Sequence, residues 1–303
     1  MAQIVKPKTQ RGKRAIEKKE PKILEDIKSA IIIRGGRTSE IVTDVLKNIY
    51  ILKKPNAVMF QRKNILRPFE DQNSLEFFSQ KNDASLFVFG SHSKKRPNNL
   101  VFGRFYDGHI LDMAEFGVEN YIPISGFKTE KCTSGTKPCL LFSGEIFDSD
   151  PEYKRIKSIF IDFWRGPLVE SIRLQGLEHV LQFTAIDGKV LMRSYRVALK
   201  KSGLKTPRIE LVEMGPSIDF LVRRTRLASN DLYKEACRQP KAAKIQKTKN
   251  VDHDVFGTKT GRIHMQSQDL DKLQTRKVKA LKRTTQSSKD ATKKAKRQKQ
   301  AET

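Results

Sequence analysis

Short clusters of lysine and arginine are the residues of this sequence best suited to chemistry, namely the binding of phosphate groups. One cluster lies in the stretch HSKKRPNN at 92–99 and contains Lys94, Lys95 and Arg96. A second cluster surrounds Pro55 and contains Lys53, Lys54, Arg62 and Lys63. A cation placed beside a phosphate releases condensed counterions, and this release drives the binding of nucleic acids. The alternative for both clusters is a run of charge that is merely solvated.

The two basic motifs at 92–99 and 34–37 are expected to lie between different kinds of secondary structure. We expect 92–99 to join two strands, so that a rigid sheet would hold its three cations at one end. A further motif, Arg34-Gly35-Gly36-Arg37, could bind phosphate through free backbone amides. We favour a plain loop between two helices for this motif, because paired glycines mark loops.

Motifs typical of catalysis are missing from the sequence. The 5 histidines form no H-x-x-x-H pair and have no carboxylate at metal-ligand spacing. Neither a G-x-S-x-G elbow, a P-loop nor a G-x-G-x-x-G motif occurs. The 3 cysteines form no C-x-x-C pair, which suits a reducing compartment and argues against a disulfide framework or a zinc knuckle. We therefore expect a binding protein without enzyme activity, metal or cofactor.

The net charge is +26 and the pI is close to 10.0, far above the values of a neutral metabolic enzyme. Such an excess of cations attracts polyanions, which leaves RNA, DNA or an anionic membrane surface as candidates. The sequence has no stretch of about 18 consecutive apolar residues, so we expect no membrane-spanning helix. The first residues, MAQIVKPKTQRGKRAIEKKE, lack the apolar stretch of a signal peptide. We expect an intracellular protein.

The charge is uneven along the chain and suggests three regions. Residues 236–303 contain 19 Lys and Arg against 6 Asp and Glu, and residues 1–28 contain 9 against 4. We interpret 1–28 as a basic N-terminal extension, 29–235 as a folded α/β unit and 236–303 as a basic tail.

The tail has two parts. Residues 282–303 contain no Leu, Ile, Val or aromatic residue, so they cannot repay the entropy of folding alone. Residues 261–282 carry six apolar side chains, at Ile263, Met265, Leu270, Leu273, Val278 and Leu281. We favour a docking segment that becomes ordered on a ribonucleoprotein surface, and packing against the protein's own core remains the alternative.

In the middle region, helical spacing and capping residues predict four helices. Thr38 and Ser39 can cap a helix that ends before Pro55, with apolar positions Ile41, Val42, Val45, Leu46 and Ile49. Further helices are expected at 73–81 and 151–165, the latter with an apolar stripe of Tyr153, Ile156, Ile159, Phe160 and Phe163 that suits a core. Ser229 can cap a final helix.

Strands are expected between and after these helices. Residues 85–90 form an apolar run of strand length. Asp107-Gly108 and Asp187-Gly188 each lie between two apolar runs and predict tight hairpin turns. Because a hairpin with an Asp-Gly turn occurs twice, the core could consist of two copies of one half-domain. A further strand pair is expected at 208–214 and 218–224, around Gly215-Pro216.

Several segments together resemble the ribosome production factor 2 branch of Brix-domain proteins. They are KKPNAVMFQRKN at 53–64, RPFED at 67–71, LEFFSQKND at 75–83, SHSKKRPNN at 91–99, ELVEMGPSIDF at 210–220 and GRIHMQSQDLDKLQTRKVKALK at 261–282. This resemblance covers nearly the whole chain. It implies a Brix domain of two related α/β halves, about 29–125 and 126–235, with mixed sheets and hairpins.

The resemblance also implies a function. Members of this branch are assembly factors of the large ribosomal subunit in the nucleus and nucleolus, without enzyme activity. It implies a heterodimer with the regulator of ribosome synthesis protein, recruitment of 5S rRNA with its two bound ribosomal proteins, action on the large-subunit rRNA precursor, and no membrane. An RNA-modifying enzyme and a DNA-packaging protein remain alternatives.

The resemblance further implies RNA contacts by basic residues of the loop and the tail. These are Lys94, Lys95, Arg96, Arg262, Arg276, Lys277 and Lys279. One departure concerns the residue after the Gly-Pro pair, which is often basic in the family and is Ser217 here. This departure puts a phosphate contact at that position in doubt.

Overall fold

The computed structural model describes residues 7–20, 25–169, 172–173, 176–203, 206–240, 248–256, 258–267, 269 and 290–297. The chain divides into two compact units, Met1–Ile245 and Gln246–Thr303. Within the described part of the second unit, β11 (Val251–His253) and β12 (Lys259–Gly261) form a small antiparallel hairpin.

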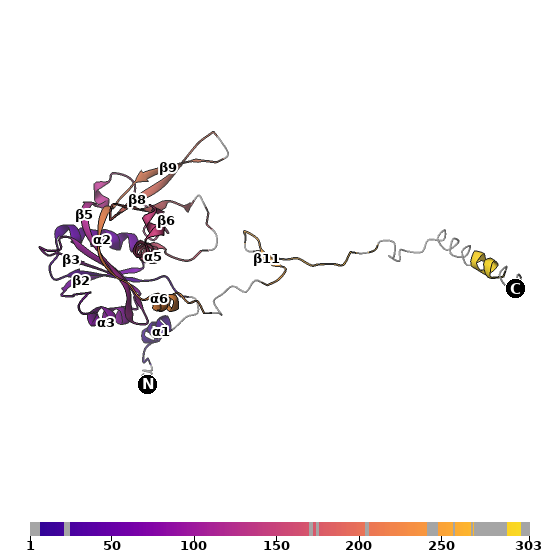
Figure 1. Cartoon of the computed structure of the whole chain (residues 1–303), viewed down its shortest axis with the longest axis horizontal. Helices are drawn as coiled ribbons and strands as arrows, with labels where there is room; N and C mark the ends of the chain where they lie inside the picture. Colours follow the sequence, from indigo (N-terminus) through magenta and orange to yellow (C-terminus); the bar gives the residue numbers. More distant parts are fainter. Residues whose placement is uncertain are drawn as a thin grey trace. The chain divides into compact units, whose positions relative to one another are not determined.

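The first unit is built on one mixed sheet of ten strands (Figure 1). Its strands are β1 (Ala30–Gly35), β2 (Ala57–Asn64), β3 (Leu86–Ser91), β4 (Asn99–Tyr106), β5 (His109–Ile122), β6 (Cys139–Ser143), β7 (His179–Ile186), β8 (Lys189–Lys200), β9 (Arg208–Glu213) and β10 (Ser217–Arg226). Their order is β2-β1-β3-β4-β5-β10-β8-β7-β6, and β9 pairs with β8 outside this path.

The strand order repeats on the two sides of the central β5–β10 pair. On one side the sheet runs β1-β3-β4-β5, and on the other it runs β6-β7-β8-β10. Each series begins with a parallel pair and continues with antiparallel pairs. The two Asp-Gly turns are not equivalent in this repeat, because one joins β4 to β5 and the other joins β7 to β8.

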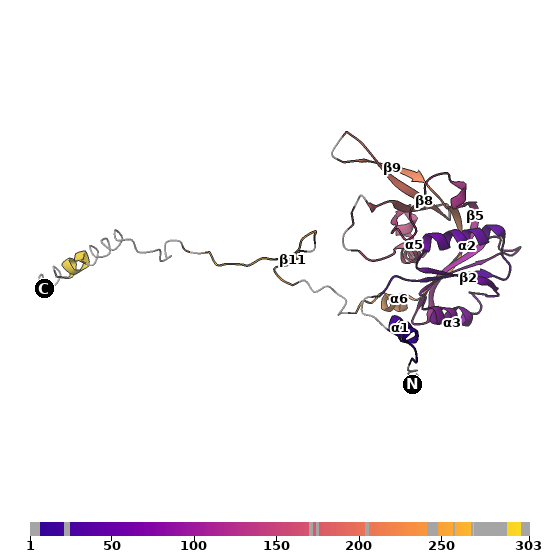
Figure 2. The same ribbon diagram turned by 180° about the vertical axis from the view of Figure 1, so that it is seen from behind.

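The helices of the first unit are α1 (Gln10–Lys19), α2 (Glu40–Lys53), α3 (Asn73–Asn82), the 3-10 turn η1 (Ile124–Gly126), α4 (Ile146–Ser149), α5 (Pro151–Trp164) and α6 (Asn230–Ala236). Two of them, α2 and α5, pack on one face of the sheet, and α3 packs on the other (Figures 1 and 2). Strand β1 contributes to both cores, since Ile32 faces α2 while Ile31 and Ile33 face α3. A strand that is buried on both faces has a continuous apolar run in place of alternating residues, and β1 was not among the strands predicted from the sequence.

The larger core is rich in phenylalanine. Phe102 of β4 lies edge-on to Phe116, Phe160, Phe163 and Phe220, with ring centroids 5.4–5.9 Å apart. All five predicted stripe residues of α5 are buried, which confirms that the stripe belongs to the core.

Local signals in the sequence correctly predicted several elements. Ser39 caps α2 by accepting a hydrogen bond from the Val42 amide, although Ile41 is exposed and does not join the buried stripe. Asp107 and Asp187 have φ angles of 49° and 48°, and the glycine after each also has a positive φ, as tight hairpin turns require. Ser229 caps α6 by accepting a hydrogen bond from the amide of Leu232.

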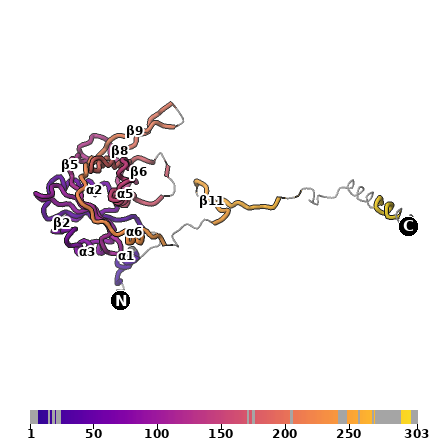
Figure 3. Tube along the Cα trace, viewed as in Figure 1, coloured from indigo at the N-terminus to yellow at the C-terminus, as the bar shows by residue number. Residues whose placement is uncertain are grey.

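The expected strand pair around Gly215-Pro216 is wrong. β9 pairs with residues 195–200 of β8, while β10 pairs with residues 189–192 of β8 and with β5. Both strands therefore follow the same edge of β8 in the same direction, and β9 lies beside β8 in Figure 3. The Met214 amide, between β9 and β10, donates to the Ser194 carbonyl. Because β8 is 12 residues long, one strand edge accommodates both segments in succession, and Gly215-Pro216 is an interruption rather than a turn.

Candidate nucleic-acid interface

Three basic segments meet at one edge of the sheet, where the parallel strands β1, β2 and β3 end. The register pairs Arg34 of β1 with Lys63 of β2 and with Gly90 of β3. The ends of β1 and β2, which carry Arg34 and the pair Arg62-Lys63, therefore lie side by side with the end of β3, from which the 92–98 loop leaves the sheet. The crevice outside the carboxyl ends of parallel strands is a common place for ligands in α/β sheets.

The motif Arg34-Gly35-Gly36-Arg37 joins β1 to α2, so the expected loop between two helices is wrong. The segment before the motif is a strand, β1, whose apolar residues Ala30–Ile33 are buried on both faces of the sheet. Gly35 is required by close packing, since a Cβ atom there would lie 2.8 Å from the carbonyl oxygen of Gly90. Arg37 is exposed at the start of α2.

The 92–98 loop is held against this motif by hydrogen bonds. The His92 amide donates to the Arg37 carbonyl at 2.8 Å, and the Asn98 amide donates to Nδ1 of His92 at 3.1 Å. Ser39, the cap of α2, donates its hydroxyl to Oδ1 of Asn98 at 2.7 Å. The loop joins β3 to β4 as predicted, and it presents Lys94 and Lys95 as exposed side chains.

Arg96 of the same loop lies in a different environment, which we call the arginine cluster: Arg96, Arg223 and Arg224 around Glu115. Nη1 of Arg96 donates to both carboxylate oxygens of Glu115 at 3.0 Å, and Nε of Arg224 donates to the same carboxylate. Arg223 donates to Oδ1 of Asn99 at 2.9 Å and to the Pro97 carbonyl at 2.7 Å.

Glu115, Arg223 and Arg224 were not among the residues predicted from the sequence to bind phosphate. The three residues lie on β5 and β10, and hydrogen bonds from Arg96 to Glu115 and from Arg223 to Pro97 join these strands to the loop. The adjacent pair Arg223-Arg224 is the one local signal that could have found them.

The predicted group around Pro55 is divided by the structure. Arg62 and Lys63 lie exposed on the edge strand β2, near the basic edge described above. Lys53 is buried, against expectation, because its ammonium donates to the Phe163 carbonyl and lies 5.3 Å from the Phe163 ring. Lys54 is exposed beside the Tyr50 ring at the carboxyl end of α2, whereas the basic edge adjoins the amino end of this helix.

In the tail, the structure describes only part of the predicted docking segment. Arg262 is exposed, and its amide donates to the Asn250 carbonyl at 2.8 Å beside the β11–β12 hairpin. Ile263 and Met265 are also exposed. Arg276, Lys277 and Lys279 lie outside the described residues.

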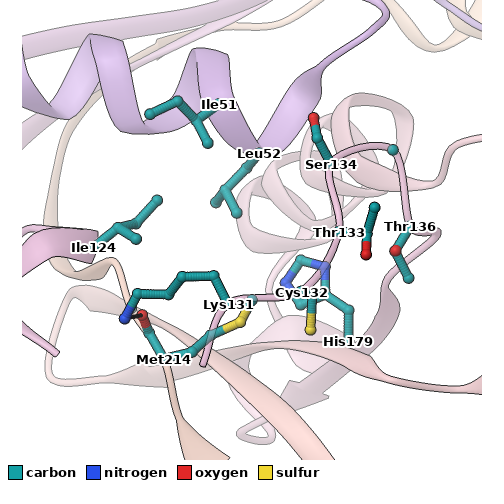
Figure 4. A pocket seen from close by; sticks show the side chains of 12 residues that line it. Ile51, Leu52, Ile124, Lys131, Cys132, Thr133, Ser134, Thr136, His179 and Met214 are labelled. Carbon is teal, nitrogen blue, oxygen red and sulfur yellow. Dashed lines mark hydrogen bonds between the residues drawn. The ribbon is translucent and has the colours of Figure 1, made fainter. Parts of the chain in front are cut away.

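A small pocket opens between the end of α2 and the segment 131–136 (Figure 4). Two of its lining residues are ionisable groups of the kind used in nucleophilic catalysis, Cys132 and His179. Burial raises the pKa of the Cys132 thiol, and burial lowers the pKa of His179 to about 4. Both groups are therefore neutral near pH 7, and His179 shares a hydrogen bond of 3.0 Å with Ser194.

Among the residues that the structure describes, no three His, Cys, Asp or Glu side chains are grouped so that they could hold a metal ion. Within the same residues, none of the helices has both the length and the apolar composition that crossing a membrane requires.

Comparisons with known proteins identify the family. The Brix domain matches residues 35–224. The human "Ribosome production factor 2 homolog" is 60% identical over 258 residues, which cover 85% of this chain and 84% of that protein. "Ribosome biogenesis protein RPF2" of Saccharomyces cerevisiae is 45% identical over 294 residues, with coverages of 93% and 86%. A solved structure, "Crystal structure of probable ribosomal biogenesis protein from Aeropyrum pernix K1", matches with 11% identity and a TM-score of 0.43, covering 67% of this chain and 99% of that one. The chain belongs to the ribosome production factor 2 branch of the Brix-domain family.

Proposed function

We propose that this protein is an assembly factor of the large ribosomal subunit that acts by binding RNA and protein rather than by catalysis. One observation carries the proposal: separate basic segments, at 34–37, 62–63 and 92–98, converge on one edge of a rigid sheet. The names of the relatives, which describe ribosome production and ribosome biogenesis, support the same role.

In this proposal the basic edge binds rRNA phosphates. Lys94 and Lys95 are exposed and need no movement to reach a phosphate, and the hydrogen-bonded loop keeps them in place. Specificity then comes from the shape of the RNA and from protein partners, since phosphate contacts by themselves carry no sequence information.

The partners follow from the family resemblance. They are 5S rRNA with its two bound ribosomal proteins, the large-subunit rRNA precursor, and the regulator of ribosome synthesis protein as the second chain of a heterodimer. In this role the protein recruits the 5S ribonucleoprotein to pre-ribosomal particles and supports maturation of the precursor RNA. We place it in the nucleus and nucleolus, without a membrane partner. Arg262, Arg276, Lys277 and Lys279 of the tail supply further phosphate contacts along the particle.

A titration with a 5S rRNA transcript tests the basic edge. The full chain is compared with a double variant, Lys94→Gln with Lys95→Gln, at several salt concentrations. Since each phosphate contact adds about 0.7 to 0.9 to the slope of log affinity on log salt, loss of two contacts lowers the slope by about 1.4 to 1.8. The matched control, Lys154→Gln with Lys201→Gln, removes the same charge from two exposed lysines elsewhere in the fold. Equal effects of the two double variants would contradict an RNA contact at the 92–98 loop.

Purification of the full chain from cells tests the assembly role. Recovery of 5S rRNA, large-subunit precursor RNA and the heterodimer partner supports the proposal, and recovery of neither RNA defeats it. The rival functions give other results. A DNA-packaging protein binds duplex DNA as tightly as structured RNA at matched salt, and an RNA-modifying enzyme changes the mass of nucleotides in its substrate.

A further inference from the structure

The arginine cluster holds more positive charge than its single carboxylate can balance. We propose that Arg96 and Arg224, fixed beside each other by the buried carboxylate of Glu115, form a binding site for one RNA phosphate group. This inference rests on the proposed function, since it assumes that the basic edge binds RNA, and it names the atoms that would make one contact.

The anchor of the site is buried while its two arginines are not. The side chain of Glu115 is 2% exposed, whereas those of Arg96 and Arg224 are 43% and 42% exposed. A buried carboxylate requires a cationic partner, because an unpaired charge in the interior is costly. One arginine would satisfy this requirement, so the second has no structural need to bind Glu115.

The contacts with Glu115 leave donors of both guanidinium groups for a ligand. Arg96 uses Nη1 and Arg224 uses Nε. A guanidinium carries five N–H donors in a planar fork that matches the oxygens of a phosphate. The Arg224 guanidinium carbon also lies 3.7 Å from the centre of the Phe69 ring, which fixes the plane of this group. Both forks are thus oriented before a ligand arrives, so little side-chain entropy is lost on binding.

Arg223 supports the site without being free to bind the ligand itself. Its guanidinium is engaged by Asn99 and Pro97, and it lies over Gly117, where a Cβ atom would come within 2.5 Å of Nη2. The absence of a side chain at Gly117 therefore gives Arg223 its place. The other carboxylate that acts on Arg223, Glu119, is paired with Lys189, so the three arginines around Glu115 keep an excess of positive charge that attracts an anion.

RNA fits this site better than an acidic segment of a protein. Lys94 and Lys95, which directly precede Arg96 in the loop, are exposed and extend the positive surface beyond the cluster. A nucleic-acid backbone carries a regular row of phosphates that can occupy the cluster and the lysines together.

Conservative variants of the full chain test the site by binding of a 5S rRNA transcript. Arg96→Lys and Arg224→Lys keep the charge and the pairing with Glu115 but lose the fork, so each is expected to weaken binding about fivefold to tenfold with little change in the salt slope. The matched control is Arg208→Lys, which makes the same change at an exposed arginine of β9 that is paired with Glu210.

A second measurement uses only the wild-type chain, so it does not depend on whether a variant folds. Modification of the wild-type chain by an arginine-selective dicarbonyl reagent, read by mass spectrometry, is compared with and without the transcript. Bound RNA is expected to protect Arg96 and Arg224 but not Arg208 of β9.

The outcomes separate this inference from the proposed function. In one outcome the wild-type chain binds the transcript, Arg96 and Arg224 stay unprotected, and the variants Arg96→Lys and Arg224→Lys bind as tightly as wild type. This outcome overturns the inference and leaves the proposed function standing. If the wild-type chain does not bind RNA, both fail. Protection of the two arginines by a polyglutamate peptide but not by RNA would also overturn the assignment and indicate a protein ligand.

Discussion

The buried lysine at position 53 gives the sharpest test of how the structure divides the basic residues. Burial lowers the pKa of Lys53 to about 8, the neighbouring Lys28 acts in the same direction, and Asp162 opposes the shift. The perturbation is Lys53→Met, which replaces the ammonium by an apolar side chain of similar length. The matched control is Lys54→Met, which changes the adjacent exposed lysine.

The sign and size of the effect follow from proton linkage. The unfolded chain keeps the Lys53 proton up to the ordinary pKa of 10.5, whereas the folded protein releases it near 8. Between these values the unfolded state binds more protons, so the free energy of unfolding rises with pH. From about pH 7 to about pH 9.5 this contribution amounts to about 2 kcal/mol.

Urea denaturation at the two pH values measures this contribution. The wild-type protein and Lys54→Met are expected to gain it, and Lys53→Met is expected to lack it, because all other titrating groups are shared. In the RNA titration, Lys53→Met is expected to bind within about twofold of wild type, since a buried ammonium releases no counterions from a phosphate. The reasoning is refuted if Lys53→Met keeps the pH-dependent gain, or if it weakens RNA binding as much as the Lys94 and Lys95 double variant.

Three further predictions concern the stability of the fold. Burial lowers the pKa of His179 to about 4, against an ordinary value of 6.5. As the pH falls between these values, the unfolded state binds a proton at this residue and the folded state does not. The free energy of unfolding should therefore drop by about 2 kcal/mol between about pH 7 and pH 5, and His179→Gln should abolish this drop in urea denaturation. Phe102→Ala leaves a cavity among four other phenylalanine rings and should cost about 3 to 5 kcal/mol by the same measurement; a loss below about 1 kcal/mol would show that Phe102 is not central to the core. Gly188→Ala meets no atom within 4 Å but must keep a φ of 76°, so it should cost about 1 to 2 kcal/mol. Gly103→Ala should cost more, because its Cβ would lie 2.3 Å from the ring of Phe87; thermal unfolding of the two variants would contradict this reasoning if their order were reversed.

Elements with local causes were predictable from the sequence. The cap of α2 at Ser39 and the turns at Asp107-Gly108 and Asp187-Gly188 depend on residues close together in the chain. The amphipathic helix α5 was predictable because one period of apolar residues defines its buried face.

Elements whose pairing is nonlocal were not predictable in the same way. β9 and β10 were identified as strands, but the sequence suggested that they pair with each other. They pair with β8 instead, because this strand is long enough for both and β5 occupies the other edge of β10. Likewise, β1 was missed because burial on both faces removes the alternation that marks a strand.

By itself the sequence determined the excess of positive charge, its division between core and extensions, and the motifs that indicate the family. It could not determine which cations meet or which are free to bind RNA. Lys53 and Lys54 have identical side chains at adjacent positions, yet one is buried against Phe163 of α5 and the other is exposed. In the same way, Arg96 meets Arg224 because both bind Glu115 on a third segment. Burial and ion pairing depend on residues far apart in the chain, and only the tertiary structure brings these residues together.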